Sequence, residues 1–202
     1  MRGTKVIRRV LTAVACLFFL VLSAEASTIE QWANSVIGFS SQWDSVDWSA
    51  AQALGAPDTF SYGDIPTAWA PLPDNGTLEY ITLSYSTAVY ASSITIRETN
   101  GNGFVYRVDV LDQNNVLHTV WSGTDPSQPG NPVDFLVSFP QTSFLVTGVE
   151  IYTDTNHDLS TWEEIDAVQL SGSTTHVPVP PTLLLLGTGL VGLVGLSRFR
   201  KS

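Results

Sequence analysis

Acidic side chains dominate the residues of this chain that could do chemistry, and their excess favours binding a cation. The 202 residues contain nine Lys and Arg against nineteen Asp and Glu. Seven of the nine bases lie near the two ends, and only Glu25 of the acids does. Residues 27–172 therefore carry Arg97 and Arg107 against eighteen acids, a net charge of about −16. Such a charge repels nucleic acid, so nucleic-acid binding is excluded.

Signatures of catalysis are weak, and no catalytic residue is predicted. His118, His157 and His176 are isolated in the sequence, and neither Gly-x-Ser-x-Gly nor His-Glu-x-x-His is present. Glu163 and Glu164 resemble a glycosidase pair. However, neighbours on a strand point to opposite faces and cannot flank one bond. The sequence favours a binding or structural role over an enzyme.

Tryptophan is the second group that could bind a ligand, because sugars pack on aromatic faces. The chain has six tryptophans, most of which are expected to fill the core. Trp43, Tyr62 and Trp69 lie in stretches rich in Gly, Pro and Asp, where exposure is expected. These three are the candidate ligand-binding residues. Trp121 ends a strand and Trp162 starts one, so both are expected to be buried.

The elements that must position these side chains are strands. Apolar and β-branched residues recur, mostly in alternation, over residues 78–85, 89–97, 104–111, 116–121, 133–139, 144–153 and 165–170. Turn residues such as those at 100–103 separate the runs. The pattern predicts an all-β antiparallel sandwich. Helix is expected only at 28–36 and at 50–54, where Ser49 is placed to cap the second piece.

The N-terminus has the pattern of a secretory signal peptide over residues 1–26. Four bases precede an apolar stretch at 10–22, and Ala24-Glu25-Ala26 forms a small-x-small cleavage site. The mature chain is expected to begin near Ser27. Cys16 is then removed, so the exported domain must be held by its core, or by metal, without disulfides.

The C-terminus, residues 177–202, carries three signals in a fixed order. A proline-rich stretch is followed by an apolar run at 182–196 and a basic end at 198–201. As a helix the apolar run would be about 22 Å long, which is short of a membrane core of about 30 Å. Cations directly after an apolar run halt translocation. The order predicts a marginal membrane helix, with residues 173–176 as a linker.

This order resembles the PEP-CTERM sorting signal of Gram-negative, biofilm-forming bacteria. Val177-Pro178-Val179-Pro180 stands where that family has Val-Pro-Glu-Pro. The resemblance implies an inner-membrane intermediate, cutting near the motif by an exosortase-type enzyme, and transfer to the cell surface. The alternative is an ordinary C-terminal membrane anchor.

Segments of the body resemble a discoidin-like, galactose-binding-like domain. They are Trp48-Ser49-Ala50-Ala51-Gln52-Ala53-Leu54-Gly55-Ala56-Pro57-Asp58, Thr67-Ala68-Trp69, Ile94-Thr95-Ile96-Arg97 and the run 162–170. The resemblance implies that residues 27–172 form an eight-stranded jelly roll whose last strand closes beside the first. Many members bind glycans through loops at one end of the barrel.

The same resemblance implies a structural calcium ion. It places the loop containing Asp58 beside the entry to the closing strand, where Glu164 and Asp166 lie. Calcium takes six to eight oxygen ligands, which loop carbonyls and these acids could supply. We therefore expect Asp58, Glu164 and Asp166 as the metal ligands.

The sequence taken together predicts an exported, surface-sorted, non-catalytic binding or matrix protein of an extracellular polysaccharide layer. Its expected partners are a glycan and an exosortase-type enzyme, with the membrane as a partner before processing. A glycan-active hydrolase and a purely structural matrix protein without a specific ligand are the alternatives. Two carboxylates about 5 to 10 Å apart across a cleft would favour the hydrolase.

Overall fold

Eight strands carry the described part of the chain, which is residues 27–176 of a computed structural model. They are β1 (Ile29–Trp32), β2 (Ser35–Phe39), β3 (Leu78–Asn100), β4 (Val105–Asp112), β5 (Leu117–Ser122), β6 (Val133–Ser138), β7 (Val146–Asp154) and β8 (Glu164–Ser173). Every strand pairing among the described residues is antiparallel. The all-β antiparallel sandwich that the alternation predicts is confirmed.

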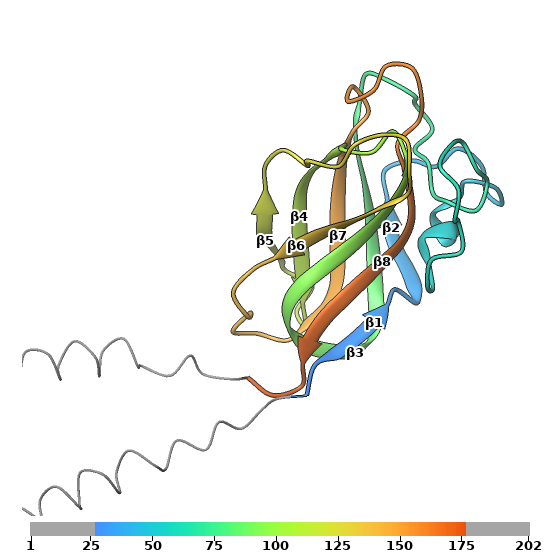
Figure 1. Ribbon diagram of the computed structural model, residues 1–202. Coiled ribbons are helices and arrows are strands. Elements are labelled where there is room, and N and C mark those ends of the chain that lie inside the picture. Colours follow the sequence, from blue (N-terminus) through green and yellow to red (C-terminus); the bar gives the residue numbers. More distant parts are fainter. Residues whose placement is uncertain (1–26, 177–202) are drawn as a thin grey trace, which may run out of the picture. The chain divides into compact units, whose positions relative to one another are not determined.

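Strand β3 belongs to both layers of the sandwich (Figure 1). Its first arm pairs with β2 and β7, from Leu78 opposite Asp154 down to Val89 opposite Val146. Its second arm continues past the bend into the other layer, where it lies between β6 and β8 and ends with Asn100 opposite Glu164. The register shifts between Ser84 and Val89, where the strand bends. The two strands predicted at 78–85 and 89–97 are the two arms of this one strand.

The core lies between the layers and follows from the alternation of side chains. Alternate residues of the four central strands are fully buried, among them Ile81, Leu83, Val108, Val110, Val149, Ile151, Val168 and Leu170. The remaining positions of these strands face outward or lie under loops. A sandwich packed in this way is stabilised mainly by burial of apolar surface.

The helix predicted at 28–36 is wrong. Those residues form β1 and β2, and β1 pairs with β8 from Ile29 opposite Gly172 to Trp32 opposite Gln169. Hydrogen bonding to distant strands therefore outweighs local helix propensity, which is a weak determinant. The closing of the last strand beside the first, which the family resemblance implied, is present.

The second predicted helix is a single 3₁₀ turn, η1 (Ala50–Ala53). Ser49 does not cap it with its side chain; instead, Gln42 Oε1 accepts the Ala50 N–H at 2.9 Å. Gly55 follows with φ +87°, a conformation that favours glycine. Turn η1 lies in the long connection from β2 to β3.

Four connections, including the longest, gather at one end of the sandwich (Figure 1). They are residues 40–77, 101–104, 123–132 and 155–163. The start of β1 and the end of β8 lie at the opposite end. Within residues 27–176, no helix is long and apolar enough to cross a membrane. The signal peptide, the apolar helix at 182–196 and the motif Val177–Pro180 lie outside the described residues.

Candidate functional site

A pocket that is open to solvent lies at the loop end of the sandwich. Its lining residues are Trp43, Trp48, Asp64, Ala70 and Trp162. The first four come from the connection between β2 and β3, and Trp162 comes from the connection that leads into β8. We call this site the tryptophan pocket.

Main-chain hydrogen bonds hold the long connection in the shape that forms the pocket. The Trp43 N–H donates to the Ala70 carbonyl at 2.9 Å, and the Ala70 N–H donates to the Trp48 carbonyl at 3.2 Å. Trp48 has φ +50°, a left-handed conformation that is unfavourable for a bulky residue. Its N–H donates to the Pro66 carbonyl at 3.0 Å, so both of its peptide groups are bonded. The surrounding structure thus sustains a strained tryptophan at the pocket.

Two of the indole rings meet edge to face across the two connections. The ring centroids of Trp43 and Trp162 lie 5.0 Å apart with an interplanar angle of 69°. Trp43 is 45% exposed. The indole nitrogens of Trp48 and Trp162 are buried and have no partner among the described residues. A concave site with aromatic walls and few polar groups is the usual form of a site for an organic ligand.

Asp64 supplies the only charge in the lining of the pocket, and a buried acid stands behind it. Glu164 is fully buried, and its side chain contacts that of Asp64. It also accepts the Ile65 N–H at 3.4 Å and is 3.5 Å from the Asn100 amide nitrogen. Burial, together with the Asp64 carboxylate, raises the pKa of Glu164 to about 9.

Two further buried glutamates lie at the same end of the sandwich. Burial raises the pKa of Glu98 to about 10, and contact with Asp125 adds to this. Burial likewise raises the pKa of Glu163 to about 8. One carboxyl oxygen of each of Glu98, Glu163 and Asp125 has no partner within residues 27–176. The loop end therefore retains acids that the fold does not neutralise with a base.

The three predicted ligand-binding aromatics have different surroundings. Trp43 lines the tryptophan pocket, as a binding residue would. The expected exposure of Trp69 is wrong, because it is fully buried and its indole N–H donates to the Ser41 carbonyl at 3.1 Å. Tyr62 is half-buried, and its hydroxyl accepts the Gly101 N–H at 3.2 Å. Neither Tyr62 nor Trp69 lines the pocket.

Four of the five lining residues were not predicted, namely Ala70 and three residues whose side chains could bind a ligand. Trp48 lies in the motif that carried the family resemblance, and Asp64 is one of many loop acids. Trp162 was expected to be buried but is half-buried. The sequence contains no local signal for Trp162, because its contact with Trp43 depends on how two distant connections fold together. The composition of Trp and Asp in the connection 40–77 was the usable signal.

The structure does not bring the three predicted calcium ligands together. Glu164 contacts Asp64, whereas Asp58 contacts Asp166. The carboxylate of Asp166 also accepts the N–H groups of Asp58 and Thr59 at 3.2–3.4 Å, so donors rather than carbonyl oxygens face it. No group of three His, Cys, Asp or Glu side chains within residues 27–176 could hold a metal ion. Calcium binding stays a prediction, and of its three expected ligands only Asp58 and Asp166 are in contact with each other.

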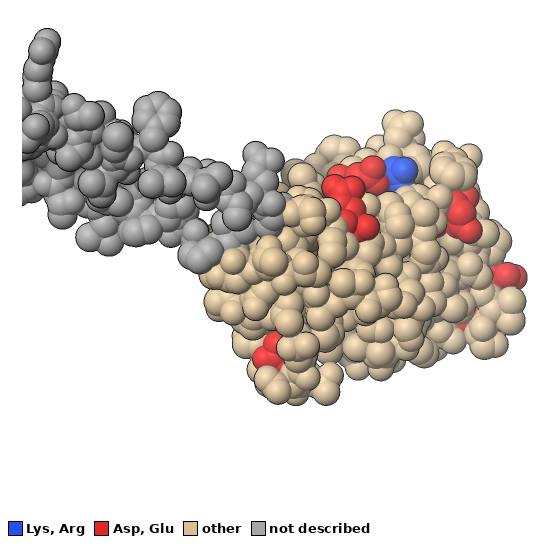
Figure 2. Space-filling view, turned by 90° about the horizontal axis from the view of Figure 1, so that it is seen from below, with Lys and Arg blue, Asp and Glu red and all other residues tan. Residues whose placement is uncertain are grey.

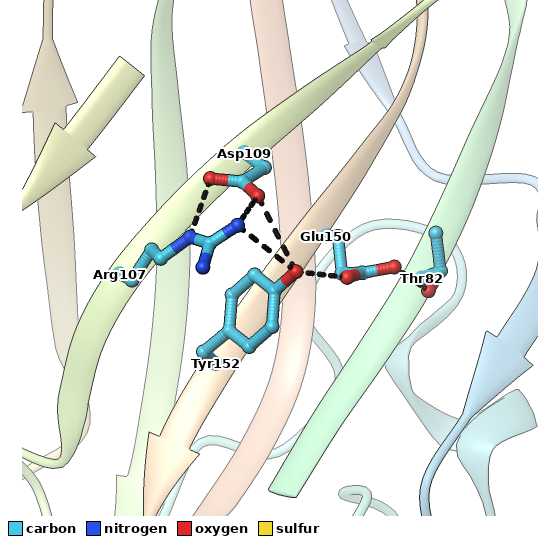
Figure 3. A network of polar contacts seen from close by, with 5 residues as sticks. All are labelled: Thr82, Arg107, Asp109, Glu150 and Tyr152. Carbon is cyan, nitrogen blue, oxygen red and sulfur yellow. Dashed lines mark hydrogen bonds and ion pairs between the residues drawn. The ribbon is translucent and has the colours of Figure 1, made fainter. Parts of the chain in front are cut away.

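On the outer face of the sheet containing β4 and β7, unlike at the loop end, the acids are paired with a base and with hydroxyl groups (Figure 3). Arg107 Nε donates to Asp109 Oδ1 at 2.8 Å, and its guanidinium lies over the Tyr152 ring at 4.4 Å. The Tyr152 hydroxyl bonds to Glu150, which also accepts from Thr82 Oγ1 at 2.6 Å. We call these five residues the outer-face network. Each member is bonded to another member.

Arg97, the only other lysine or arginine within residues 27–176, is also paired: its guanidinium lies 3.3 Å from the carboxylate of Asp134. On the face seen in Figure 2, acidic side chains form separate patches, and the basic patch lies next to an acidic one. No base of the described residues lines the tryptophan pocket. The pocket is therefore an aromatic site in a negative field.

Comparison with known protein families assigns the chain to a family. A family model described as "Pappalysin-1, SD scarf domain, C-terminal" matches residues 22–180. The chain belongs to this family. A second model, the PEP-CTERM protein-sorting motif, matches residues 176–201 and overlaps the end of the first match. The sorting signal inferred from the Val-Pro-Val-Pro stretch is confirmed, and it marks the scarf domain for export and surface sorting.

Solved structures share the fold of the scarf domain. A putative chitobiase fragment from Bacteroides thetaiotaomicron has a TM-score of 0.56 at 13% identity, covering 78% of this chain and 99% of that one. The family 32 carbohydrate-binding module of Clostridium perfringens NanJ, in complex with galactose, has a TM-score of 0.51 at 18% identity, covering 71% and 99%. The galactose-binding-like β-sandwich is confirmed.

A third structure shows that this fold does not fix the ligand. Reduced XRCC1, bound to the DNA polymerase β catalytic domain, matches the scarf domain with a TM-score of 0.51 at 18% identity, covering 72% of this chain and 99% of that one. The function must therefore be argued from the site itself. A search of curated proteins found no match to the chain.

Proposed function

We propose that the scarf domain is a non-catalytic glycan-binding domain and that the tryptophan pocket is its binding site. The observation that carries this proposal is the edge-to-face pair of Trp43 and Trp162, 5.0 Å apart, with Trp48 and Asp64 in the same lining. Aromatic faces bind the apolar face of a sugar ring, and a carboxylate accepts hydrogen bonds from its hydroxyl groups. The pocket offers both.

The hydrolase alternative is less well supported by the same geometry. A glycosidase uses two carboxylates on either side of the bond that it cuts. The tryptophan pocket is lined by one carboxylate, that of Asp64. Glu164 contacts Asp64 from a fully buried position, so the two acids are adjacent and do not face each other across the pocket. A binding role needs no second acid.

The sorting signal gives the proposed role its location. We propose that a Gram-negative host holds the chain briefly at the inner membrane by residues 182–196, and that an exosortase-type enzyme cuts near Val177–Pro180. The scarf domain then binds polysaccharide at the cell surface or in a biofilm matrix. Intact-mass measurement of the surface form tests the processing step. Loss of residues 182–202 is expected, and a retained C-terminus would leave a simple anchor.

Residues 27–176 are a suitable test protein for binding, because they contain every strand and every core residue of the described fold. We expect immobilised polysaccharides to retain this protein and Trp43→Ala or Trp162→Ala to abolish retention. Phe60→Ala is the matched control, since Phe60 is 77% exposed on the same connection but does not line the pocket. Equal retention of all four proteins would contradict the proposed site, and retention of none of them would leave the matrix alternative.

A further inference from the structure

The charge around the tryptophan pocket discriminates between kinds of sugar. Asp64 lies in the lining and is exposed, and its side chain contacts the buried Glu164. Within residues 27–176 the only lysine or arginine side chains are those of Arg97 and Arg107, which are paired with Asp134 and Asp109. No lysine, arginine or histidine lines the pocket, so none neutralises the Asp64 carboxylate there or holds an acidic sugar in the lining.

Further acids lie next to the tryptophans of the pocket. Asp44 follows Trp43 directly, Asp47 precedes Trp48, and both acids are exposed. Together with Asp64 in the lining, these acids add negative charge to the connection 40–77, which supplies four of the five lining residues. A uronate or a phosphorylated sugar would bring further negative charge to this site, which is unfavourable. Acidic glycans are therefore poor ligands for the site.

A positively charged sugar group meets two favourable surfaces in the same pocket. The faces of indole rings attract an ammonium group through the ring quadrupole, and tryptophan is the strongest of the aromatic side chains in this respect. The Asp64 carboxylate can accept a charge-assisted hydrogen bond from the same group. Trp43, Trp48 and Trp162 supply indole rings and Asp64 the carboxylate. This combination is typical of a site for an organic cation.

We propose that the tryptophan pocket selects sugar residues that carry a free amino group, such as glucosamine, over N-acetylated and acidic sugars. The inference rests on the proposed function and specifies its ligand class. N-acetylation removes the charge and two of the three N–H donors, while leaving the sugar ring available for stacking. The natural ligand is then a polysaccharide that is at least partly de-N-acetylated.

Calorimetric titration of residues 27–176 with tetramers of glucosamine, of N-acetylglucosamine and of galacturonate tests the inference, at a pH where the amine is protonated. We expect the glucosamine tetramer to bind at least about tenfold more tightly than the acetylated one, with no binding of the uronate. Asp64→Asn should remove that preference while retaining the weak binding of the acetylated tetramer. Trp43→Ala should weaken the binding of both.

A protein with a net charge of about −16 also attracts any polycation, so generic attraction needs its own control. Asp74→Asn removes an exposed acid from the same connection, outside the pocket lining, and should leave the affinity for the glucosamine tetramer unchanged. Tetralysine should not displace the sugar.

Three outcomes would overturn the inference. Equal affinity for the two hexosamine tetramers would do so while leaving glycan binding intact. A similar loss in Asp64→Asn and Asp74→Asn, or displacement by tetralysine, would show attraction by net charge alone. Absence of binding by every sugar would overturn the proposed function as well.

Discussion

The outer-face network and the loop end each bury a carboxylate completely, but they treat it in opposite ways. Asp109 and Glu98 are both fully buried. Arg107 and Tyr152 bond to Asp109, whereas Glu98 receives the Gly103 N–H and lies against a second acid, Asp125. One region neutralises its buried acid with a base, and the other brings two acids together.

The two treatments shift the pKa in opposite directions. Burial pushes the pKa of Asp109 up, but hydrogen bonds from Arg107 and Thr119 and the guanidinium charge outweigh it and hold that pKa below its ordinary value. No base opposes burial at Glu98, so its pKa rises to about 10. Paired acids thus stabilise the sandwich, while unpaired acids accumulate where the pocket lies. Costly groups retained at one end of a fold are a feature of functional sites.

Breaking the outer-face network should have the largest effect on stability. Arg107→Met keeps much of the cover over Asp109 but removes its counter-charge, which leaves a buried carboxylate bonded only to the hydroxyl groups of Thr119 and Tyr152. We expect the free energy of unfolding, measured with urea at pH 7, to fall by about 3 kcal/mol. Arg97→Met is the matched control, since its partner Asp134 is 53% exposed, and it should cost less than about 1 kcal/mol. Equal losses would show that the network is an ordinary surface feature.

Neutralising Glu98 should change the free energy of unfolding by a smaller amount and should raise it. The folded-state pKa of Glu98 lies above its unfolded value of about 4.3, so the folded state retains a proton that the unfolded state releases as pH rises between about 4.3 and 10. The contribution of this group to stability is therefore present below about pH 4 and is lost progressively as pH rises toward 10.

Glu98→Gln removes this titration while keeping the shape and the acceptor for the Gly103 N–H. We expect the variant and the wild type to be similarly stable at pH 5, and the variant to be about 2 kcal/mol more stable at pH 6.5. Urea unfolding at both pH values measures the difference. A variant that is destabilised by the same amount at both would mean that Glu98 acts through packing.

Of the three changes, added calcium should alter the free energy of unfolding least. If it binds the Asp58–Asp166 pair, a fivefold excess over Kd would add about 1 kcal/mol to the free energy of unfolding. We expect Asp58→Asn to abolish this increment and Glu164→Gln to leave it unchanged, because Glu164 contacts Asp64 instead. Thermal unfolding with calcium, and with equal magnesium as the control for screening, provides the measurement. An increment that survives Asp58→Asn would exclude this pair.

Local pattern was sufficient to predict most of the sandwich but not its first two strands. In the run of β4, for example, Val108 and Val110 alternate with Arg107 and Asp109, because one face of the strand meets the apolar core and the other carries the outer-face network. The sequence of β1 carries no comparable alternation. Its conformation comes from pairing with β8, in which Ile29, for example, lies opposite Gly172. Such pairing is decided by the whole fold.

The site was predicted less well for the same physical reason. Trp43 was identified from the composition of its loop, but Trp69, in a similar loop, bridges to Ile165 and is buried. Contacts between Asp64 and Glu164, or between Trp43 and Trp162, join segments that are distant in the sequence. Residue type indicates which chemistry is available, whereas long-range packing decides which of those residues meet.

The central claim is that the loop end, and not the remainder of the sandwich, binds the glycan through the tryptophan pocket. The six tryptophans give six indole N–H signals in a nitrogen-labelled sample of residues 27–176, assignable by single Trp→Phe variants. Titration with the glucosamine tetramer should shift the signals of Trp43, Trp48 and Trp162 and leave those of Trp32 and Trp121 unchanged. Shifts confined to Trp32 or Trp121, or no shift with any of the three tetramers, would contradict the account.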